Sequence, residues 1–106
     1  MRPHGRHQRR VWARMIESVD AYRAGHFDLR KLVVDLQGLL GAADLHDAHL
    51  VNEWWDHEAP IDMELELRTE AWAPEGSASD EALDRALSDF QTWAREVLDS
   101  TDSART

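Results

Sequence analysis

Three histidines and a glutamate in the segment HDAHLVNEWWDHE are the residues of this chain best suited to hold a metal ion. His49, Glu53 and His57 follow one another at intervals of four residues, which places them on one face of a helix. His46 lies about one turn earlier, on a nearby face. Imidazole and carboxylate groups at this spacing chelate Zn²⁺ and other transition metals. One hypothesis is therefore a transition-metal-binding helical protein, or a small enzyme, that uses His46, His49, Glu53 and His57.

The alternative for the same segment is a solvated polar helix face. One helix seldom completes a tetrahedral site, so a further ligand would have to come from elsewhere, with His26 as a candidate. The residue order also differs from the HExxH motif, in which glutamate directly follows the first histidine. We therefore predict no resident metal and no other cofactor, and keep the histidine cluster as the alternative.

Carboxylates crowd the region after this segment. Paired acids can do general acid–base work when the pKa of one of them is raised. The sequence places no nucleophile elbow and no glycine-rich phosphate loop beside them. We therefore expect a protein that is not an enzyme.

Charge is distributed unevenly along the chain. The first ten residues, MRPHGRHQRR, contain four arginines and no acid, whereas the rest holds eight Lys and Arg against 21 Asp and Glu. The body is thus −13 within a chain of −9. A domain this acidic repels anions and attracts basic surfaces, so we expect a basic protein partner and no nucleic acid on the body. Residues 1–10 are predicted to be a disordered basic tail, with a nucleic-acid or membrane arm as the alternative.

The length and composition fit one domain of about a hundred residues without disulfides. The chain has 106 residues and no cysteine. No apolar run approaches the roughly 20 residues that a membrane span needs, so no membrane partner is expected. These features favour a cytoplasmic protein.

Apolar residues recur at steps of three and four along most of the chain, which predicts helices near 11–24, 28–43, 45–72 and 79–99. Gly25 is expected to end the first helix, and Asp28, Asp44 and Ser79 to cap the next three. Pro60 should kink or break the third helix, because proline removes a hydrogen bond and clashes with the preceding turn. Residues 62–68 alternate as a strand would, but an isolated strand has no partner here, so we predict helix.

The predicted fold is an all-α four-helix bundle over residues 11–99, with a frayed C-terminus at 100–106. Trp12, Trp72 and Trp93 fall on apolar stripes and are expected in the core. Trp54 and Trp55 point about 100° apart, which leaves room for one of them to be exposed beside acids. The residues around which the bundle should pack are Leu32, Leu36, Leu39, Leu87, Phe90 and Trp93.

The run AYRAGHFDLRKLVVDLQGLLGAA, followed by NEWWDHE and a later acidic helix, resembles small acidic helical immunity proteins of bacterial toxin systems, of the colicin D immunity kind. The similarity covers about half of the chain. It consists of a helix, Gly25, Phe27, a leucine-rich helix, and the aromatic and acidic residues from Glu53 to Trp55. The resemblance implies an inhibitor that masks the basic substrate-binding surface of a nuclease toxin.

Charge and resemblance together predict a non-catalytic, immunity- or antitoxin-like interaction protein. An acidic surface can mimic nucleic-acid phosphates and bind a basic protein. A homodimer through an exposed tryptophan is a further possibility. The expected contact residues are Glu53, Trp54, Trp55, Asp56, Asp62, Glu64 and Glu66.

Overall fold

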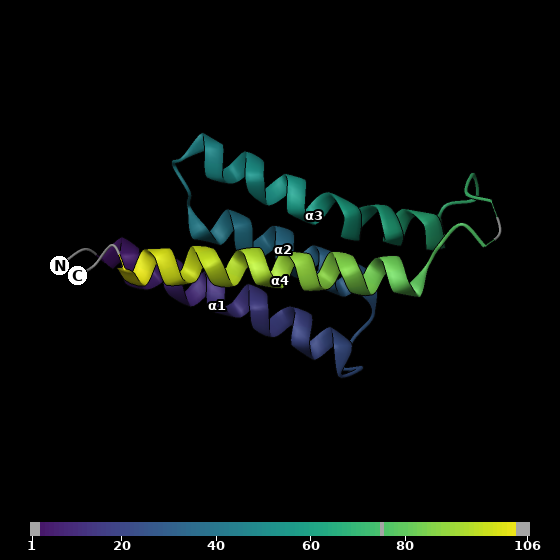
Figure 1. Ribbon diagram of the computed structural model, residues 1–106, viewed down its shortest axis with the longest axis horizontal. Coiled ribbons are helices and arrows are strands. Elements are labelled where there is room, and N and C mark those ends of the chain that lie inside the picture. The colour runs from purple at the N-terminus through teal and green to yellow at the C-terminus, as the bar shows by residue number, and fades with distance from the viewer. Residues whose placement is uncertain (1–2, 75, 104–106) are drawn as a thin grey trace.

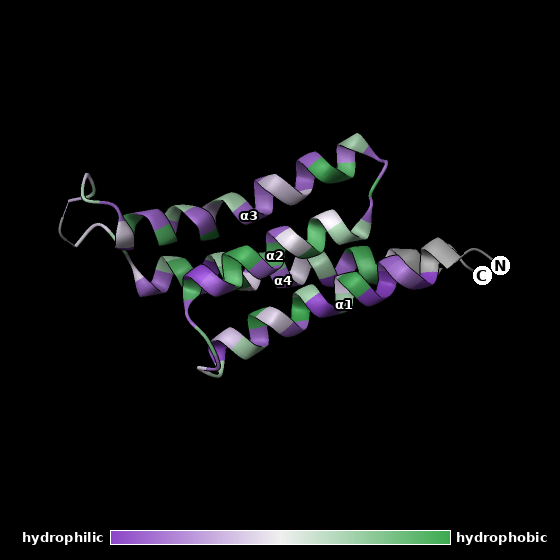
Figure 2. Ribbon diagram, turned by 180° about the vertical axis from the view of Figure 1, so that it is seen from behind, coloured by the Kyte–Doolittle hydropathy of each residue, from purple (hydrophilic) through white to green (hydrophobic). Residues whose placement is uncertain are grey.

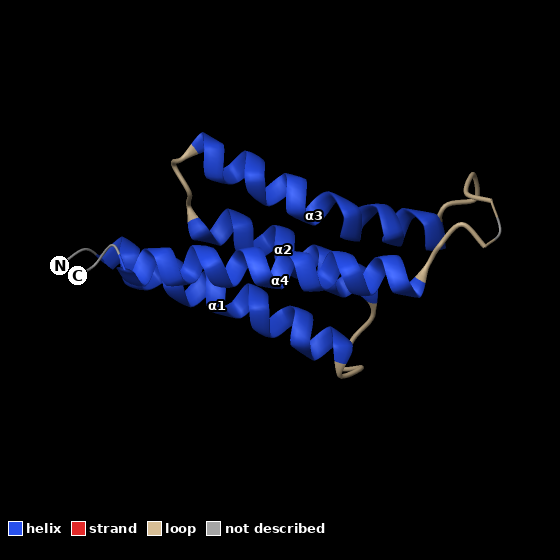
Figure 3. Cartoon of the chain, viewed as in Figure 1, coloured by secondary structure: helices blue, strands red, loops and turns tan. Residues whose placement is uncertain are grey.

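The computed structural model describes residues 3–74 and 76–103, and this part of the chain contains four α-helices and no strand (Figures 1 and 3). The helices are α1 (Pro3–Arg23), α2 (Leu29–Ala43), α3 (Ala48–Thr69) and α4 (Asp80–Ser103). The all-α prediction is therefore confirmed over the described residues, including the helical assignment of 62–68. None of these helices is both long enough and apolar enough to cross a membrane, within the segments described.

The helices pack side by side in an elongated body of 52 × 28 × 19 Å. α1 packs against α2 and α4, while α3 packs against α4 and, over a shorter stretch, against α2. Hydrophobic and hydrophilic residues alternate along each helix in Figure 2, as expected for helices that bury one face. The start of α1 and the end of α4 lie at the same end of the molecule (Figure 1).

All four helices contribute to one hydrophobic core. Of the six residues around which the bundle is predicted to pack, five are buried, and Leu39 is partly buried against them. Aromatic rings connect the helices: Trp12 meets Trp93 edge to face at 5.3 Å between centroids, and Trp54 meets Phe90 at 5.9 Å. Such pairs are favourable beyond the area that they bury.

Local signals set most helix ends as the sequence predicts. Gly25 has a φ of +85°, with hydrogen bonds from its own N–H to Tyr22 O and from His26 N to Ala21 O. This is the Schellman arrangement that glycine favours after a helix. Asp28 then caps α2 by accepting a hydrogen bond from Lys31 N at 2.9 Å. Ser79 Oγ accepts one from Ala82 N at 3.1 Å at the start of α4.

The junction between α2 and α3 differs from the prediction. Asp44 does not cap α3; it ends α2 in the left-handed region, with a φ of 52°. The cap of α3 is Asp47, which accepts hydrogen bonds from His49 N and Leu50 N. Both aspartates suit a helix end, because their short side chains bond neighbouring backbone groups.

The basic segment for which the sequence predicts a disordered tail forms, over residues 3–10, the first part of α1 in the structure. His7 Nε2 lies 2.6 Å from Ala42 O, and Gln8 Nε2 donates to Ala43 O at 3.4 Å. These two carbonyls belong to the last turn of α2, which has no basic residue of its own. α1 thus begins where it can satisfy the exposed carbonyls of α2. Residues 1 and 2 lie outside the described residues.

Pro60 does not break α3, which is helical from Ala48 to Thr69. Trp54 and Ile61, on either side of the proline, are both fully buried. Their burial offsets the hydrogen bond that proline removes. The helix ends at Thr69 and not at residue 72, whereas α4 continues beyond 99 to Ser103. Residues 104–106 of the predicted frayed end lie outside the described residues.

Candidate functional site

The outer face of α3 carries exposed apolar and acidic side chains together. We define this outer face by Trp55, Asp56, Asp62, Met63 and Glu66, which share the side of the helix that points away from the core. The side chains of Trp55 and Met63 are 44% and 48% exposed. Asp56 and Glu66 are exposed, and Asp62 is half-buried. The face therefore combines an apolar surface with three carboxylates.

The ring of Trp55 packs against a ring of the core. Its ring meets that of Trp54 edge to face, with 4.9 Å between centroids and 82° between planes. Trp54 itself is fully buried, so its ring provides a fixed support. A tryptophan fixed in this way loses little conformational freedom when a partner covers it.

Trp54 cannot be a partner-binding residue, which corrects the prediction. Its side chain is fully buried, and its Nε1 donates to Met15 Sδ at 3.4 Å. Its ring also packs against Phe90. Only one of two adjacent tryptophans on a helix can face the core directly, and here that residue is Trp54.

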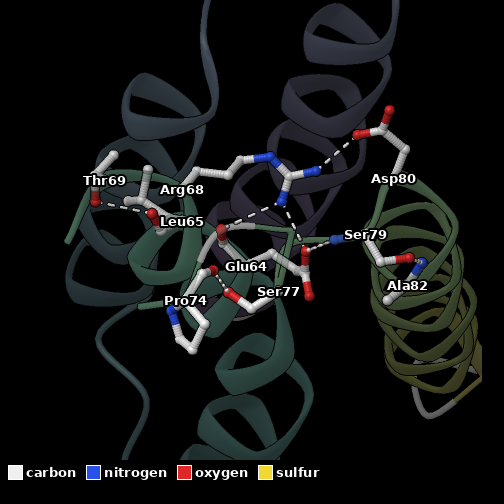
Figure 4. A network of polar contacts seen from close by, with 9 residues as sticks. All are labelled: Glu64, Leu65, Arg68, Thr69, Pro74, Ser77, Ser79, Asp80 and Ala82. Carbon is white, nitrogen blue, oxygen red and sulfur yellow. Dashed lines mark hydrogen bonds and ion pairs between the residues drawn. The ribbon is translucent and has the colours of Figure 1, made fainter. Parts of the chain in front are cut away.

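Glu64 is also unavailable to a partner, because it is buried in a polar network between α3 and α4 (Figure 4). Glu64 Oε1 accepts hydrogen bonds from Arg68 Nη1 at 2.7 Å and from Ser79 N at 3.0 Å. Arg68 Nη2 donates to Asp80 Oδ1 at 2.8 Å. This network, which we call the Glu64 clasp (Glu64, Arg68, Ser79 and Asp80), ties the end of α3 to the start of α4.

The clasp also occupies the single Lys or Arg of α3. Burial lowers the pKa of Arg68, but its hydrogen bonds to Glu64 and Asp80 outweigh burial and raise that pKa above its ordinary value. The guanidinium therefore stays charged and directed at these two carboxylates. α3 otherwise carries the acids Glu53, Asp56, Glu58, Asp62 and Glu66.

A second set of polar side chains faces α4 from the other flank of α3. Trp93 Nε1 donates to Glu53 Oε2 at 3.2 Å, and His49 Nε2 lies 3.0 Å from Glu53 Oε1. His57 stacks on Trp93 with 4.6 Å between centroids and lies 3.0 Å from Asp89 Oδ2 through its Nδ1. Glu53 is therefore engaged in contacts within the chain and sits beside the outer face, not on it.

The four candidate metal ligands do not converge. His46 lies in the loop before α3 and is 3.7 Å from Asp44. His49 turns to Glu53, and His57 turns to Asp89 on another helix. Within the described residues, no group of three His, Cys, Asp or Glu side chains could hold a metal ion. The alternative hypothesis of a site built from His46, His49, Glu53 and His57 therefore has no support in the geometry.

Glu58 is a feature that the sequence analysis missed. Its side chain is fully buried, and neither carboxyl oxygen has a hydrogen-bond partner among the described residues. Burial, and then the charge of Asp62, raise its pKa to about 7, while the amide of Gln37 on α2 opposes the rise. Gln37 lies close enough to act on the carboxyl without forming a well-aligned hydrogen bond. The available signal was position: Glu58 is one turn after Trp54 and three residues before Ile61, on the core side of α3.

Trp72 is exposed, although its apolar stripe predicts a core position. It lies in the loop after α3, and its side chain is 62% exposed. Because α3 ends at Thr69, the stripe that predicted burial does not extend to Trp72.

Comparisons of this chain with models of protein families, with curated proteins and with solved structures gave no match.

Proposed function

We propose that this chain is a non-catalytic interaction protein that binds a basic protein partner through the outer face of α3. The observation that carries the proposal is the exposure of Trp55 and Met63 on one helix face together with Asp56, Asp62 and Glu66. Exposed tryptophan is a typical anchor of protein interfaces. The surrounding acids favour a partner of opposite charge.

The outer face holds much of the large apolar side-chain surface that is exposed on the described part of the chain. Trp55 and Met63 are two of the four large hydrophobic side chains exposed on the described part of the chain, and Trp72 follows in the adjoining loop. Covering such groups removes apolar area from water, and this stabilises a complex by about 25 cal/mol per Å² before the costs of association. The fixed ring of Trp55 keeps those costs low.

The acids determine the chemistry of the partner. The outer face presents three carboxylates, and the one Lys or Arg of α3 is directed into the Glu64 clasp. Such a surface attracts a cationic protein and increases the association rate at low salt. A nuclease toxin, whose phosphate-binding surface is basic, fits this chemistry, and the proposed role is that of an immunity or antitoxin protein in the bacterial cytoplasm.

Partner capture from the native host tests this proposal, with tagged wild-type chain, Trp55→Ala and Val34→Ala as baits. Val34 is a matched control, because it is 60% exposed on α2, away from the outer face. We expect wild type and Val34→Ala to retain the same basic protein, and Trp55→Ala to lose at least tenfold of it, since an interface tryptophan contributes about 2 kcal/mol or more. Equal retention by all three baits would exclude the outer face as the binding surface.

A second copy of the chain is the competing occupant of this face. Two chains of net charge −9 repel one another, but an apolar seam can outweigh charge that salt screens. The mass in solution at low and high salt separates the two possibilities. A dimer that Trp55→Ala dissociates would replace the proposal of a basic partner, and a monomer at both salt concentrations would support it.

A further inference from the structure

Glu58 is a buried acid with no compensating bond, at the centre of α3. Its side chain has no exposed surface, and its two oxygens have no hydrogen-bond partner within the described part of the chain. An ionised carboxylate in such a place is strongly disfavoured, whereas a protonated one is tolerated. The group can therefore stay buried as long as it holds a proton.

Among the described residues, the charge that acts on Glu58 is that of Asp62, and no counter-charge keeps Glu58 ionised. On its own helix it faces Asp62, one turn away, and α2 presents the neutral amide of Gln37. Arg30, two turns before Gln37 on that side of α2, is exposed. Also on α2, Lys31 and Asp35 pair with each other. On α4, Asp89 is directed at His57. Asp62 instead adds like charge to that of an ionised Glu58.

The helix next to Glu58 is also easier to deform than the rest of α3. Pro60 has no N–H, so the carbonyl of Asp56, four residues earlier, lacks its usual backbone partner. The α2–α3 interface, at which Gln37 faces Glu58, is shorter than the α3–α4 interface. A local opening of α3 from α2 can therefore occur while the Glu64 clasp keeps α3 joined to α4.

We propose that Glu58 is a proton-binding switch: protonated, it holds the middle of α3 against α2, and on ionisation it loosens this contact. The proposal concerns the chain alone and does not depend on a partner. The same helical segment carries the outer face, so the switch would also act on partner binding there. That effect rests on the proposed function.

The pH window follows from the pKa of Glu58, about 7 in the folded chain against 4.5 as its ordinary value. Between these values the unfolded chain has released the proton that the folded chain still holds. The contribution of this proton to the free energy of unfolding is present in full below pH 4.5. It decreases as the pH rises through this window and stays constant above about pH 7. Because of Glu58, the free energy of unfolding is therefore expected to be lower at pH 8 than at pH 5.

Urea unfolding at pH 5 and pH 8 tests the proposal, with wild type, Glu58→Gln and Glu66→Gln. Glu66 is the matched control, an exposed glutamate on the same helix. For wild type and Glu66→Gln we expect the unfolding constant to rise on the order of 10²-fold more between the two pH values than for Glu58→Gln. The same pH dependence in all three proteins would overturn the proposal.

A direct titration keeps the proposal testable even if Glu58→Gln does not fold. In wild type with ¹³C-labelled glutamate carboxyls, the Glu58 resonance should titrate near pH 7, and hydrogen exchange in the middle of α3 should accelerate above that pH relative to α1. A titration midpoint below 5, or no selective change in α3, would overturn the switch. Neither result depends on partner binding, so failure here is distinct from failure of the proposed function.

Discussion

Removal of the Glu64 side chain should weaken the junction between α3 and α4 more than the removal of any exposed acid. Glu64 is 9% exposed and accepts two hydrogen bonds, from Arg68 Nη1 and from the backbone N–H of Ser79. Hydrogen bonds to charged groups contribute about 1.5–3 kcal/mol each, although one lost partner can be replaced by water. We therefore expect Glu64→Ala to lower the free energy of unfolding by about 2–4 kcal/mol.

The chain offers a matched control for this change. Glu81 also pairs with an arginine four residues later, but its distance to Arg85 is 3.4 Å and the two side chains are 85% and 77% exposed. An exposed pair of this kind contributes about 0.3–0.5 kcal/mol, with a similar amount from the position of Glu81 in the first turn of α4. Glu81→Ala should therefore lower the free energy of unfolding by less than about 1 kcal/mol.

Urea denaturation at constant pH, followed by circular dichroism, compares the two variants. The m-value should stay constant, because neither change alters the surface exposed on unfolding. If Glu64→Ala and Glu81→Ala destabilise the chain equally, then the clasp does not hold α3 to α4 and the reasoning is refuted. Where Glu64→Ala remains folded, it should also keep its affinity for a basic partner, since Glu64 is covered.

Three further predictions concern α3. Burial is the larger cause of the raised pKa of Glu58, and the charge of Asp62 adds to it. Asp62→Asn should therefore lower the titration midpoint of Glu58 in a carbon NMR experiment without returning it to the ordinary value, and an unchanged midpoint would remove Asp62 from the account. Trp54→Ala should cost about 3–5 kcal/mol in urea unfolding, and Trp55→Ala less than about 1 kcal/mol, because Trp54 is fully buried and Trp55 is 44% exposed; similar losses would contradict these positions. Pro60→Ala restores a backbone donor and should raise the free energy of unfolding, measured in urea, by about 1–2 kcal/mol. A lower free energy of unfolding would show that the local conformation requires proline.

The helices with continuous apolar stripes could be predicted from the sequence. α2 has Leu29, Leu32, Val33 and Leu36 on one face, and all four are buried. Gly25 was recognisable as a helix end, since few other residues tolerate its positive φ. Both the apolar stripe of α2 and the glycine that ends α1 can be read from a few neighbouring residues, without knowledge of the rest of the fold.

The helical start of the chain could not be predicted in this way. Residues 3–10 have no apolar periodicity, and α1 is extended there by contacts of His7 and Gln8 with carbonyls 35 residues away. Only the packing of α1 on α2 brings these groups together. A local pattern cannot report a partner that the fold supplies.

Only some of the predicted contact residues of α3 are exposed, because the contacts that the fold supplies cover the others. The acids that the sequence predicts as contact residues are Glu53, Asp56, Asp62, Glu64 and Glu66. Carboxylates are seldom fully buried, so a surface position is expected for each of them. Glu64 is covered because Arg68 and Ser79 satisfy it, and Glu58 is covered although no described residue bonds its oxygens. Asp56, Asp62 and Glu66 do lie on the outer face with Trp55. The position of Glu58 and Glu64, one turn after the buried Trp54 and Ile61 respectively, is the signal that separates the covered acids from the exposed ones.

The affinity of a captured basic partner for two charge-reversed chains tests the central claim most directly. Asp56→Lys with Glu66→Lys changes the outer face, and Glu96→Lys with Asp99→Lys makes the same net change on exposed positions of α4. We predict that the first pair weakens binding by at least a hundredfold at low salt, by about 3 kcal/mol, and that the second pair weakens it by less than tenfold. Equal affinities for the two variants would contradict binding through the outer face of α3.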